Sequence, residues 1–239
     1  MKTVILLFLI LIIGCKKEPA SVSEKNSDSN ISFDKREPDT ENDKAENTSA
    51  NDIKPISYVQ YAISNVPDEI KYQGSVVAMA KWKDKLGENL VFVTETSEKS
   101  TEDSRSKELF GYHYVNSRNE EEQLWRIYDF VKDCPVDLTL TYINKSLEIT
   151  DLDSNGIAES SFLYRMSCKG DVSSDDLKLL MHEGKEKFAI RGLMDMTLNG
   201  KPYQKGEMNI DPSFKNAPGV FLVYAKDKWD EYKTDKLGD

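Results

Sequence analysis

Residues that commonly carry catalysis are scarce in this sequence. Of its 239 residues only two are histidines, His113 and His182, and they lack the short spacing of a metal-binding pair. There is no G-x-S-x-G nucleophile elbow, no H-E-x-x-H zinc motif and no glycine-rich phosphate loop. Carboxylates are plentiful, but no two stand out as the acid–base pair of a glycosidase, so that alternative stays open. No catalytic residue is predicted.

Excess positive charge and long hydrophobic runs are absent as well. The chain has 42 Asp and Glu residues against 32 Lys and Arg, a formal net charge of -10, which disfavours nucleic acid as a partner. The apolar run at residues 4–13 is about ten residues long, whereas a helix that crosses a bilayer needs about 20. This run is therefore not predicted to span a membrane.

The first residues have the pattern of a signal peptide at residues 1–14. Lys2 supplies a positive start, the apolar run follows, and Gly14 precedes Cys15. A plain secretory peptide would have an A-x-A-like cleavage site, which is missing. Ile12-Ile13-Gly14-Cys15 instead resembles the lipobox of bacterial lipoproteins, with Ile12 where Leu is commonest.

The lipobox resemblance implies that the chain is held at a membrane by lipid. It implies diacylglycerol on the Cys15 sulfur, cleavage before Cys15 and acylation of the new N-terminus, and several acyl chains together give stable anchoring. Lys16 follows the cysteine where Asp would signal retention at the inner membrane, so the expected location is the outer membrane. After Cys15, the polar composition up to residue 51 predicts a disordered tether.

Strand patterns dominate residues 52–239, which we expect to form one β-rich domain. In chain order we expect strands at residues 75–82, 89–94, 109–115, 123–131, 137–143, 147–151 and 158–166, then hairpins at 177–190 and 194–208, the second turning at Asn199-Gly200. Phe221, Ala225, Trp229 and Tyr232 recur at helical spacing and predict an amphipathic helix packed on the sheet. The fold class is mainly β, an antiparallel meander of hairpins with one C-terminal helix. A curled sheet, a sandwich and a propeller-like arrangement stay open.

Cys134 and Cys168 are the two cysteines left after lipidation of Cys15. An exported protein permits a disulfide between them, and we favour it over two free thiols. The meander argues against it. If the strands at 137–143, 147–151 and 158–166 are sequential neighbours, the two cysteines lie too far apart for the bond. Either the sheet bends, the first strand pairs elsewhere, or the thiols stay free.

The stretch at residues 151–159, DLDSNGIAE, has oxygen-bearing side chains at alternate positions, as calcium requires. Asp151, Asp153 and Asn155 occupy positions one, three and five, Gly156 supplies the turn, and the Ile157 carbonyl and Glu159 fall at seven and nine. Position twelve lacks the glutamate of an EF-hand, and strands flank the loop. The stretch resembles the calcium loops of integrin-type (FG-GAP) repeats, with Asn155 in place of an Asp, which weakens affinity.

The alternative for these residues is a plain hairpin turn, because Asn155-Gly156 is itself a strong turn signal. We favour calcium, with a structural role, because a nine-residue pattern is more specific than a dipeptide. A second acidic group, Asp171, Asp175 and Asp176, has no ligand spacing and is predicted to be a solvated loop.

Residues 151–192 resemble a family of bacterial lipoproteins associated with surface polysaccharide biosynthesis. The resemblance implies a pathway and brings no catalytic residues. The first hypothesis is a non-enzymatic, lipid-anchored envelope protein that supports surface glycan assembly through a calcium-stabilised β domain. The alternatives are a glycan-acting enzyme with paired carboxylates and a β module that binds an envelope protein.

Overall fold

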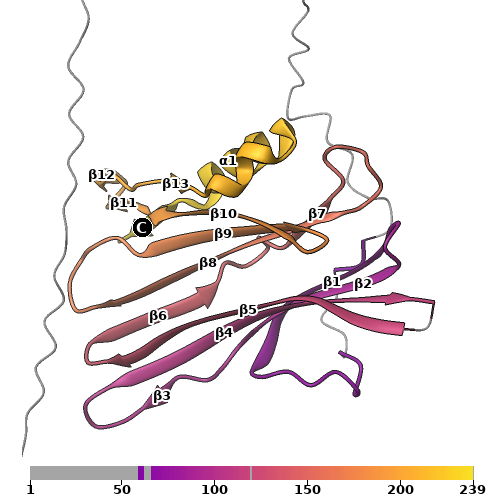
Figure 1. The fold of residues 1–239 in the computed structure, drawn as a ribbon. Helices are drawn as coiled ribbons and strands as arrows, with labels where there is room; N and C mark the ends of the chain where they lie inside the picture. The colour runs from indigo at the N-terminus through magenta and orange to yellow at the C-terminus, as the bar shows by residue number, and fades with distance from the viewer. Residues whose placement is uncertain (1–58, 62–65, 119, 239) are drawn as a thin grey trace, which may run out of the picture. The chain divides into compact units, whose positions relative to one another are not determined.

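Two antiparallel sheets packed face to face form the body of the protein (Figure 1). The computed structural model describes residues 59–61, 66–118 and 120–238. They belong to one compact unit, Asn47–Asp239. Residues 1–51, with Cys15, lie outside the described residues, so the lipid anchor and the tether stay predictions. Among the described helices, none is long and apolar enough to cross a membrane.

The first sheet is built from long hairpins. It contains β1 (Ser75–Lys83), β2 (Glu88–Glu95), β3 (Lys99–Ser100), β4 (Arg105–Ser117) and β5 (Glu120–Cys134). The order is β1-β2-β4-β5, with the short β3 also pairing with β4. The predicted hairpins around residues 84–88 and 116–121 are confirmed.

The second sheet is centred on β8. It contains β6 (Asp137–Tyr142), β7 (Glu148–Thr150), β8 (Glu159–Lys169), β9 (Asp176–Glu183), β10 (Glu186–Leu193) and β13 (Asn209–Ile210). β9 pairs along one edge of β8, and both β6 and β7 pair with the other edge. Of the alternatives left open for these strands, the structure shows the one in which the first strand pairs elsewhere: β7 does not lie between β6 and β8 but follows β6 along the same edge.

The C-terminal part adds a small sheet and the predicted helix. The helix α1 (Gly219–Tyr232) follows a short 3-10 helix, η2 (Pro212–Asn216). The hairpin of β11 (Asp195–Leu198) and β12 (Lys201–Gln204) turns at Asn199-Gly200 as predicted. β14 (Thr234–Leu237) pairs with β11 in parallel. The sequence does not predict β14, whose residues TDKL contain one large apolar side chain.

Alternation along the strands divides the interior into layers. On β8, Phe162 and Tyr164 pack between the two sheets, whereas Leu163 points to the opposite face. That opposite face is covered by α1 through Phe221, Trp229 and other side chains (Figure 1). Because both faces of β8 are covered, nearly all of its first half is buried. The mainly β fold with one C-terminal helix is confirmed, and of the arrangements left open it is a sandwich.

Candidate metal site at the start of β8

The loop at residues 151–158 joins β7 to β8 and is wound by its own polar side chains. Asp153 Oδ1 accepts from the Asn155 N–H at 3.0 Å, and Asn155 Oδ1 accepts from the Ile157 N–H at 2.7 Å. The Asp151 carboxylate accepts from the Gly156 N–H at 3.1 Å. Gly156 has a φ of +82°, a conformation that favours glycine. These side-chain-to-backbone bonds turn the chain sharply and bring positions one, three and nine together.

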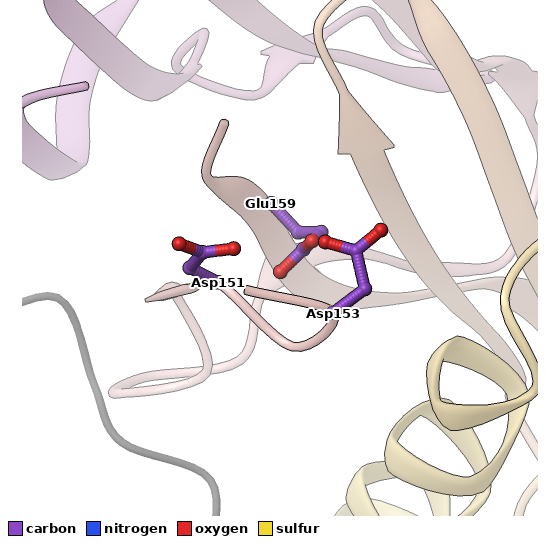
Figure 2. A group of neighbouring side chains, drawn as sticks. All are labelled: Asp151, Asp153 and Glu159. Carbon is purple, nitrogen blue, oxygen red and sulfur yellow. The ribbon is translucent and has the colours of Figure 1, made fainter. Parts of the chain in front are cut away.

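Three carboxylates converge at this turn. One oxygen from each of Asp151, Asp153 and Glu159 lies within 4.8 Å of the other two. Figure 2 shows the three side chains side by side, two from the loop and one from the first residue of β8. Carboxylate oxygens at this separation could hold a metal ion between them.

Glu159 is the buried member of the cluster, with no solvent exposure. Its Oε2 accepts from Thr150 Oγ1 and from the Leu152 N–H, both at 2.9 Å. Its Oε1 is buried and has no hydrogen-bond partner among the described residues. Burial raises the pKa of the Glu159 carboxyl to about 8, against the lowering effect of the two hydrogen bonds. A cation beside Oε1 would compensate for the missing partner.

A fourth carboxylate, Glu183, comes from the end of β9 and has no place in the sequence motif. It lies opposite Glu159 in the β8–β9 register and accepts from Asn155 Nδ2 at 2.6 Å. Burial raises the pKa of Glu183, and the charges of Asp153 and Asp151 raise it further. In the sequence, Glu183 stands at a hairpin far from the loop at residues 151–158. No motif spacing relates it to Asp151, Asp153 or Glu159, so sequence reasoning missed it.

Of the five predicted ligands, the structure brings together Asp151, Asp153 and Glu159. The Asn155 amide nitrogen lies between Asp153 and Glu183, 3.2 Å and 2.6 Å from their carboxylates, while its oxygen faces the Ile157 N–H. The predicted ligand atom of Ile157 is its carbonyl oxygen, whereas the contact seen within the loop is made by its N–H. The Asn155 amide group therefore bridges the carboxylates of Asp153 and Glu183.

The loop is also bound to the first sheet through the β1–β2 connection. Asp84 Oδ2 accepts from the Ala158 N–H at 3.0 Å, and the Lys85 N–H donates to the Gly156 carbonyl at 3.0 Å. The Lys85 ammonium donates to the Asn155 carbonyl. Because Ala158 directly precedes β8, these bonds fix the start of β8 against the opposite sheet.

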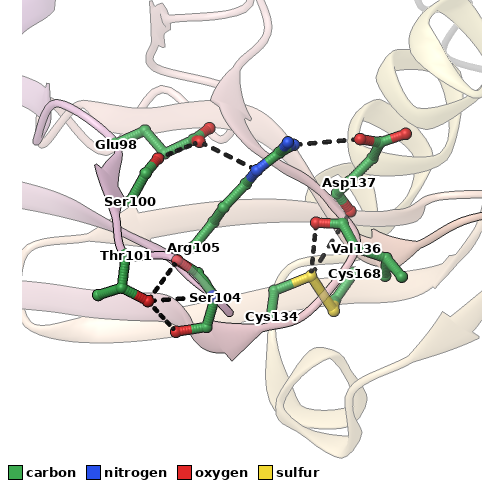
Figure 3. Close-up of polar contacts among 9 residues, drawn as sticks. All are labelled: Glu98, Ser100, Thr101, Ser104, Arg105, Cys134, Val136, Asp137 and Cys168. Carbon is green, nitrogen blue, oxygen red and sulfur yellow. Dashed lines mark hydrogen bonds and ion pairs between the residues drawn. A yellow bond between two sulfur atoms is a disulfide. The ribbon is translucent and has the colours of Figure 1, made fainter.

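The other end of β8 is fixed to the first sheet by the disulfide Cys134–Cys168 (Figure 3). The Cα atoms are 5.7 Å apart, and the bond joins the last residue of β5 to β8. The favoured pairing is confirmed, and the objection to it is resolved because β6 pairs directly with β8: Leu138 lies opposite Cys168.

The second acidic group is not wholly solvated. Asp175 is buried, with 3% of its surface exposed, and pairs with Lys169 at 2.6 Å and Arg165 at 3.7 Å. The prediction of a solvated loop is wrong for this residue, because two cations from β8 accompany it into the interior.

Comparison with known protein families found no matching family model, and no curated protein or solved structure matched the chain. The resemblances to lipoproteins and to integrin-type loops therefore stay predictions.

Proposed function

We propose that the chain is a lipid-anchored protein of the outer membrane whose β sandwich binds calcium and supports the assembly of a surface polysaccharide without catalysing a reaction. The lipobox around Cys15 supports the anchor, and the sequence resemblance of residues 151–192 supports the pathway. Two observations carry the calcium site: carboxylate oxygens of Asp151, Asp153 and Glu159 converge, and the buried Oε1 of Glu159 has no hydrogen-bond partner in the described part of the chain.

The donor set favours calcium over other ions. All donors in the cluster are carboxylate oxygens, and Glu183 adds a fourth carboxylate nearby. Zinc and copper favour nitrogen and sulfur ligands, and magnesium retains much of its water. Calcium accepts six to eight oxygens in flexible geometry, which a loop of short acidic side chains provides.

A structural role fits the surroundings of the site. The loop carries the hydrogen bonds that attach the start of β8 to the first sheet, and excess negative charge opposes its closed form. A bound cation removes that repulsion and so stabilises the contact between the sheets. The proposed role is therefore to hold the domain in a binding-competent shape.

Thermal unfolding of residues 16–239 in calcium and in chelator tests the metal. With a Kd typical of extracellular calcium modules, near 10⁻⁴–10⁻³ M, 1 mM calcium raises the Tm by roughly 1–6 °C. Asp153→Asn removes the rise, and Asp176→Asn, an exposed control in the second acidic group, keeps it. Equal Tm values with and without calcium for the unaltered protein would refute the metal site.

Deletion of the gene tests the pathway and the anchor. We expect altered surface polysaccharide in the deletion strain, restored by the unaltered gene and not by Cys15→Ala, which lacks the lipidated sulfur. Unchanged polysaccharide in the deletion strain would overturn the proposed role.

A further inference from the structure

An ion pair between a buried lysine and a half-exposed glutamate lies beneath the helix α1, away from the carboxylate cluster. Lys228 of α1 has 5% of its surface exposed, and its ammonium lies 2.6 Å from Glu148 Oε2 at the start of β7. The Tyr224 hydroxyl donates to the same oxygen at 2.9 Å and is hydrogen-bonded to Ser161 Oγ at 2.7 Å. Burying a lysine is unfavourable unless it is paired, so this network fixes the Glu148 carboxylate in one position.

Glu148, whose side chain is 48% exposed, lines a pocket of about 600 Å³. Burial raises the pKa of this carboxyl, but the charge of Lys228 and the bonds from Lys228 and Tyr224 hold it below its usual value. The carboxylate therefore stays ionised and acts as an acceptor. The pocket lies between β1, the β6–β7 connection and the end of α1, and its size is within the range of small-ligand sites.

Three phenol groups line the same pocket, and the backbone orients each of them. The Tyr61 hydroxyl accepts from the Ile149 N–H at 2.9 Å, and the Tyr142 hydroxyl accepts from the Leu147 N–H at 2.8 Å. Both keep an O–H hydrogen with which to donate. The Tyr232 hydroxyl donates to the Lys145 carbonyl at 3.2 Å and keeps its lone pairs. The pocket thus offers fixed donors and fixed acceptors.

The remaining lining determines the class of ligand. Val77, Met79 and Leu147 supply an apolar wall, and Asn144 adds an amide. The charge of Glu148 is balanced by Lys228, and Lys145 and Glu231 oppose each other at the lining, so no strong net charge attracts an anion or a cation. A neutral ligand with several hydroxyl groups and an apolar C–H face meets all of these groups.

We propose that this pocket binds a neutral pyranose unit of a glycan. The inference rests on the proposed function in linking the pocket to a surface glycan, whereas the hydrogen-bonding groups are independent of calcium. The Glu148 carboxylate accepts hydrogen bonds from ring hydroxyls, and the Asn144 amide both accepts from and donates to them. The phenols complete the polar contacts, and the apolar wall contacts the C–H face.

The test follows methyl groups of residues 16–239 by NMR, with ¹³C-labelled methionine. Met79 lines the pocket, and Met181, buried between the second sheet and α1, is an internal control. The probes are glucose, galactose and N-acetylglucosamine, with glucuronate and choline as charged comparisons. At least one neutral sugar shifts the Met79 signal saturably at millimolar concentration and leaves Met181 unchanged. No shift with any neutral sugar, or a shift with glucuronate or choline alone, would overturn the inference.

Two substitutions locate the binding. Glu148→Gln abolishes the shift of Met79, but it leaves Lys228 unpaired and could disturb folding. Asn144→Ala therefore accompanies it: Asn144 is exposed and makes no side-chain hydrogen bond to the described part of the chain, and its loss weakens sugar binding at least threefold. Glu186→Gln, at an exposed turn, leaves binding unchanged. Undiminished binding by folded Asn144→Ala contradicts the assignment.

The outcomes separate the two proposals. A protein that is stabilised by calcium but binds no neutral sugar refutes the pocket alone. If the protein binds sugar in this pocket but deletion of its gene leaves the surface polysaccharide unchanged, only the proposed pathway is refuted.

Discussion

Glu159 is fully buried, yet only one of its two carboxylate oxygens has hydrogen-bond donors among the described residues. A glutamine here keeps an oxygen for Thr150 and Leu152 and places an amide where the second oxygen points. One oxygen of the Glu159 carboxyl group lies within 4.8 Å of an oxygen of Asp151 and of Asp153, so the amide of the variant stays close to these carboxylates. The substitution Glu159→Gln therefore keeps the shape of the side chain and removes its charge, so that the effects of shape and charge can be measured separately.

We expect Glu159→Gln to have nearly the same Tm as the unaltered protein in chelator. The calcium-induced rise in Tm is lost, because calcium loses a charged ligand at the centre of the cluster. Calorimetric melts in chelator and in calcium measure the Tm of the variant and its calcium-induced rise, with Glu186→Gln as the matched exposed control. A full calcium response in Glu159→Gln would show that the ion lies elsewhere.

The two histidines lie in the sandwich interior and not at a metal site. His182 stacks on the Trp125 indole with ring centroids 4.3 Å apart, and His113 Nε2 pairs with Asn89 Oδ1 at 2.9 Å. Burial lowers the pKa of His113 to about 4, which the Asp84 charge partly opposes. Burial, together with the charges of Lys187 and His113, lowers the pKa of His182 to about 3.

The two histidine shifts contribute a loss of stability in acid, whereas the raised pKa of Glu159 contributes in the opposite direction between about pH 8 and 4.5, where the folded state binds its proton. The unfolded histidines titrate near pH 6.5, so between about pH 6.5 and pH 4 the unfolded state binds more protons than the folded state. The free energy of unfolding then decreases as the pH falls, by up to about 1.4 kcal/mol per pH unit for each histidine. Urea unfolding in chelator from neutral pH to the acid range measures this loss.

His182→Phe is the matched variant, since it keeps a ring on Trp125 but cannot bind a proton. We expect its stability to fall less steeply with pH than that of the unaltered protein. The same slope in both proteins would show that His182 is not held neutral by the fold.

Some residues of the site follow from the sequence and others do not. The alternate spacing of Asp151, Asp153 and Glu159 identifies the convergent carboxylates, because the turn that joins them is local. Asp84 and Glu183 were not predicted, because each reaches the loop from a distant strand, through the sheet-to-sheet contact and the β8–β9 register.

At the scale of elements, β8 is attached to the first sheet at both ends. The β1–β2 connection binds the residues before its start, and the disulfide binds its end. Asp84 is central to the first attachment: besides Ala158, it accepts from the Trp82 indole N–H at 2.9 Å and the Leu86 N–H at 2.8 Å. Each hydrogen bond to a charged group contributes about 1.5–3 kcal/mol.

We expect Asp84→Ala to lower the free energy of unfolding by about 2–4 kcal/mol, because several buried or half-buried donors lose their acceptor. It also weakens calcium binding, because the loop is no longer held in its closed form. Urea unfolding and a calcium titration measure the two effects. Asp103→Ala, in an exposed turn, changes neither. Unaltered stability of Asp84→Ala would contradict the proposed attachment.

The disulfide acts at the opposite end of β8 and spans 34 residues. Replacing both cysteines by serine lowers the free energy of unfolding by about 4 kcal/mol on the chain-entropy model. The calcium-induced rise in Tm persists, since the two attachments are at different ends of the strand. Loss of the calcium response in the folded double variant would show that the ends are coupled.

Element prediction succeeds where pairing is local. Each β hairpin brings together residues a few positions apart, and turn residues such as Asn199-Gly200 specify it. The pairing of β6 with β8 and of β11 with β14 joins distant segments. The alternation of apolar and polar residues along one strand does not specify the distant strand with which it pairs. The order of strands in the sheets therefore could not be predicted.

At the scale of the whole molecule, the disulfide and the hydrogen bonds of the loop at residues 151–158 join the two sheets, and we propose that calcium strengthens the attachment at the loop. Both attachments are consistent with the proposed location outside the cytoplasm, where calcium is available and thiols oxidise. The net charge of -10 adds to the benefit of a bound divalent cation, since it opposes compaction.

Calorimetric titration of calcium into residues 16–239 tests this account most directly. We predict one calcium ion per chain, bound with a Kd near 10⁻⁴–10⁻³ M, and no binding when Asp151 and Asp153 are both replaced by asparagine. Absence of binding by the unaltered protein at millimolar calcium, or undiminished binding by the double variant, would contradict it.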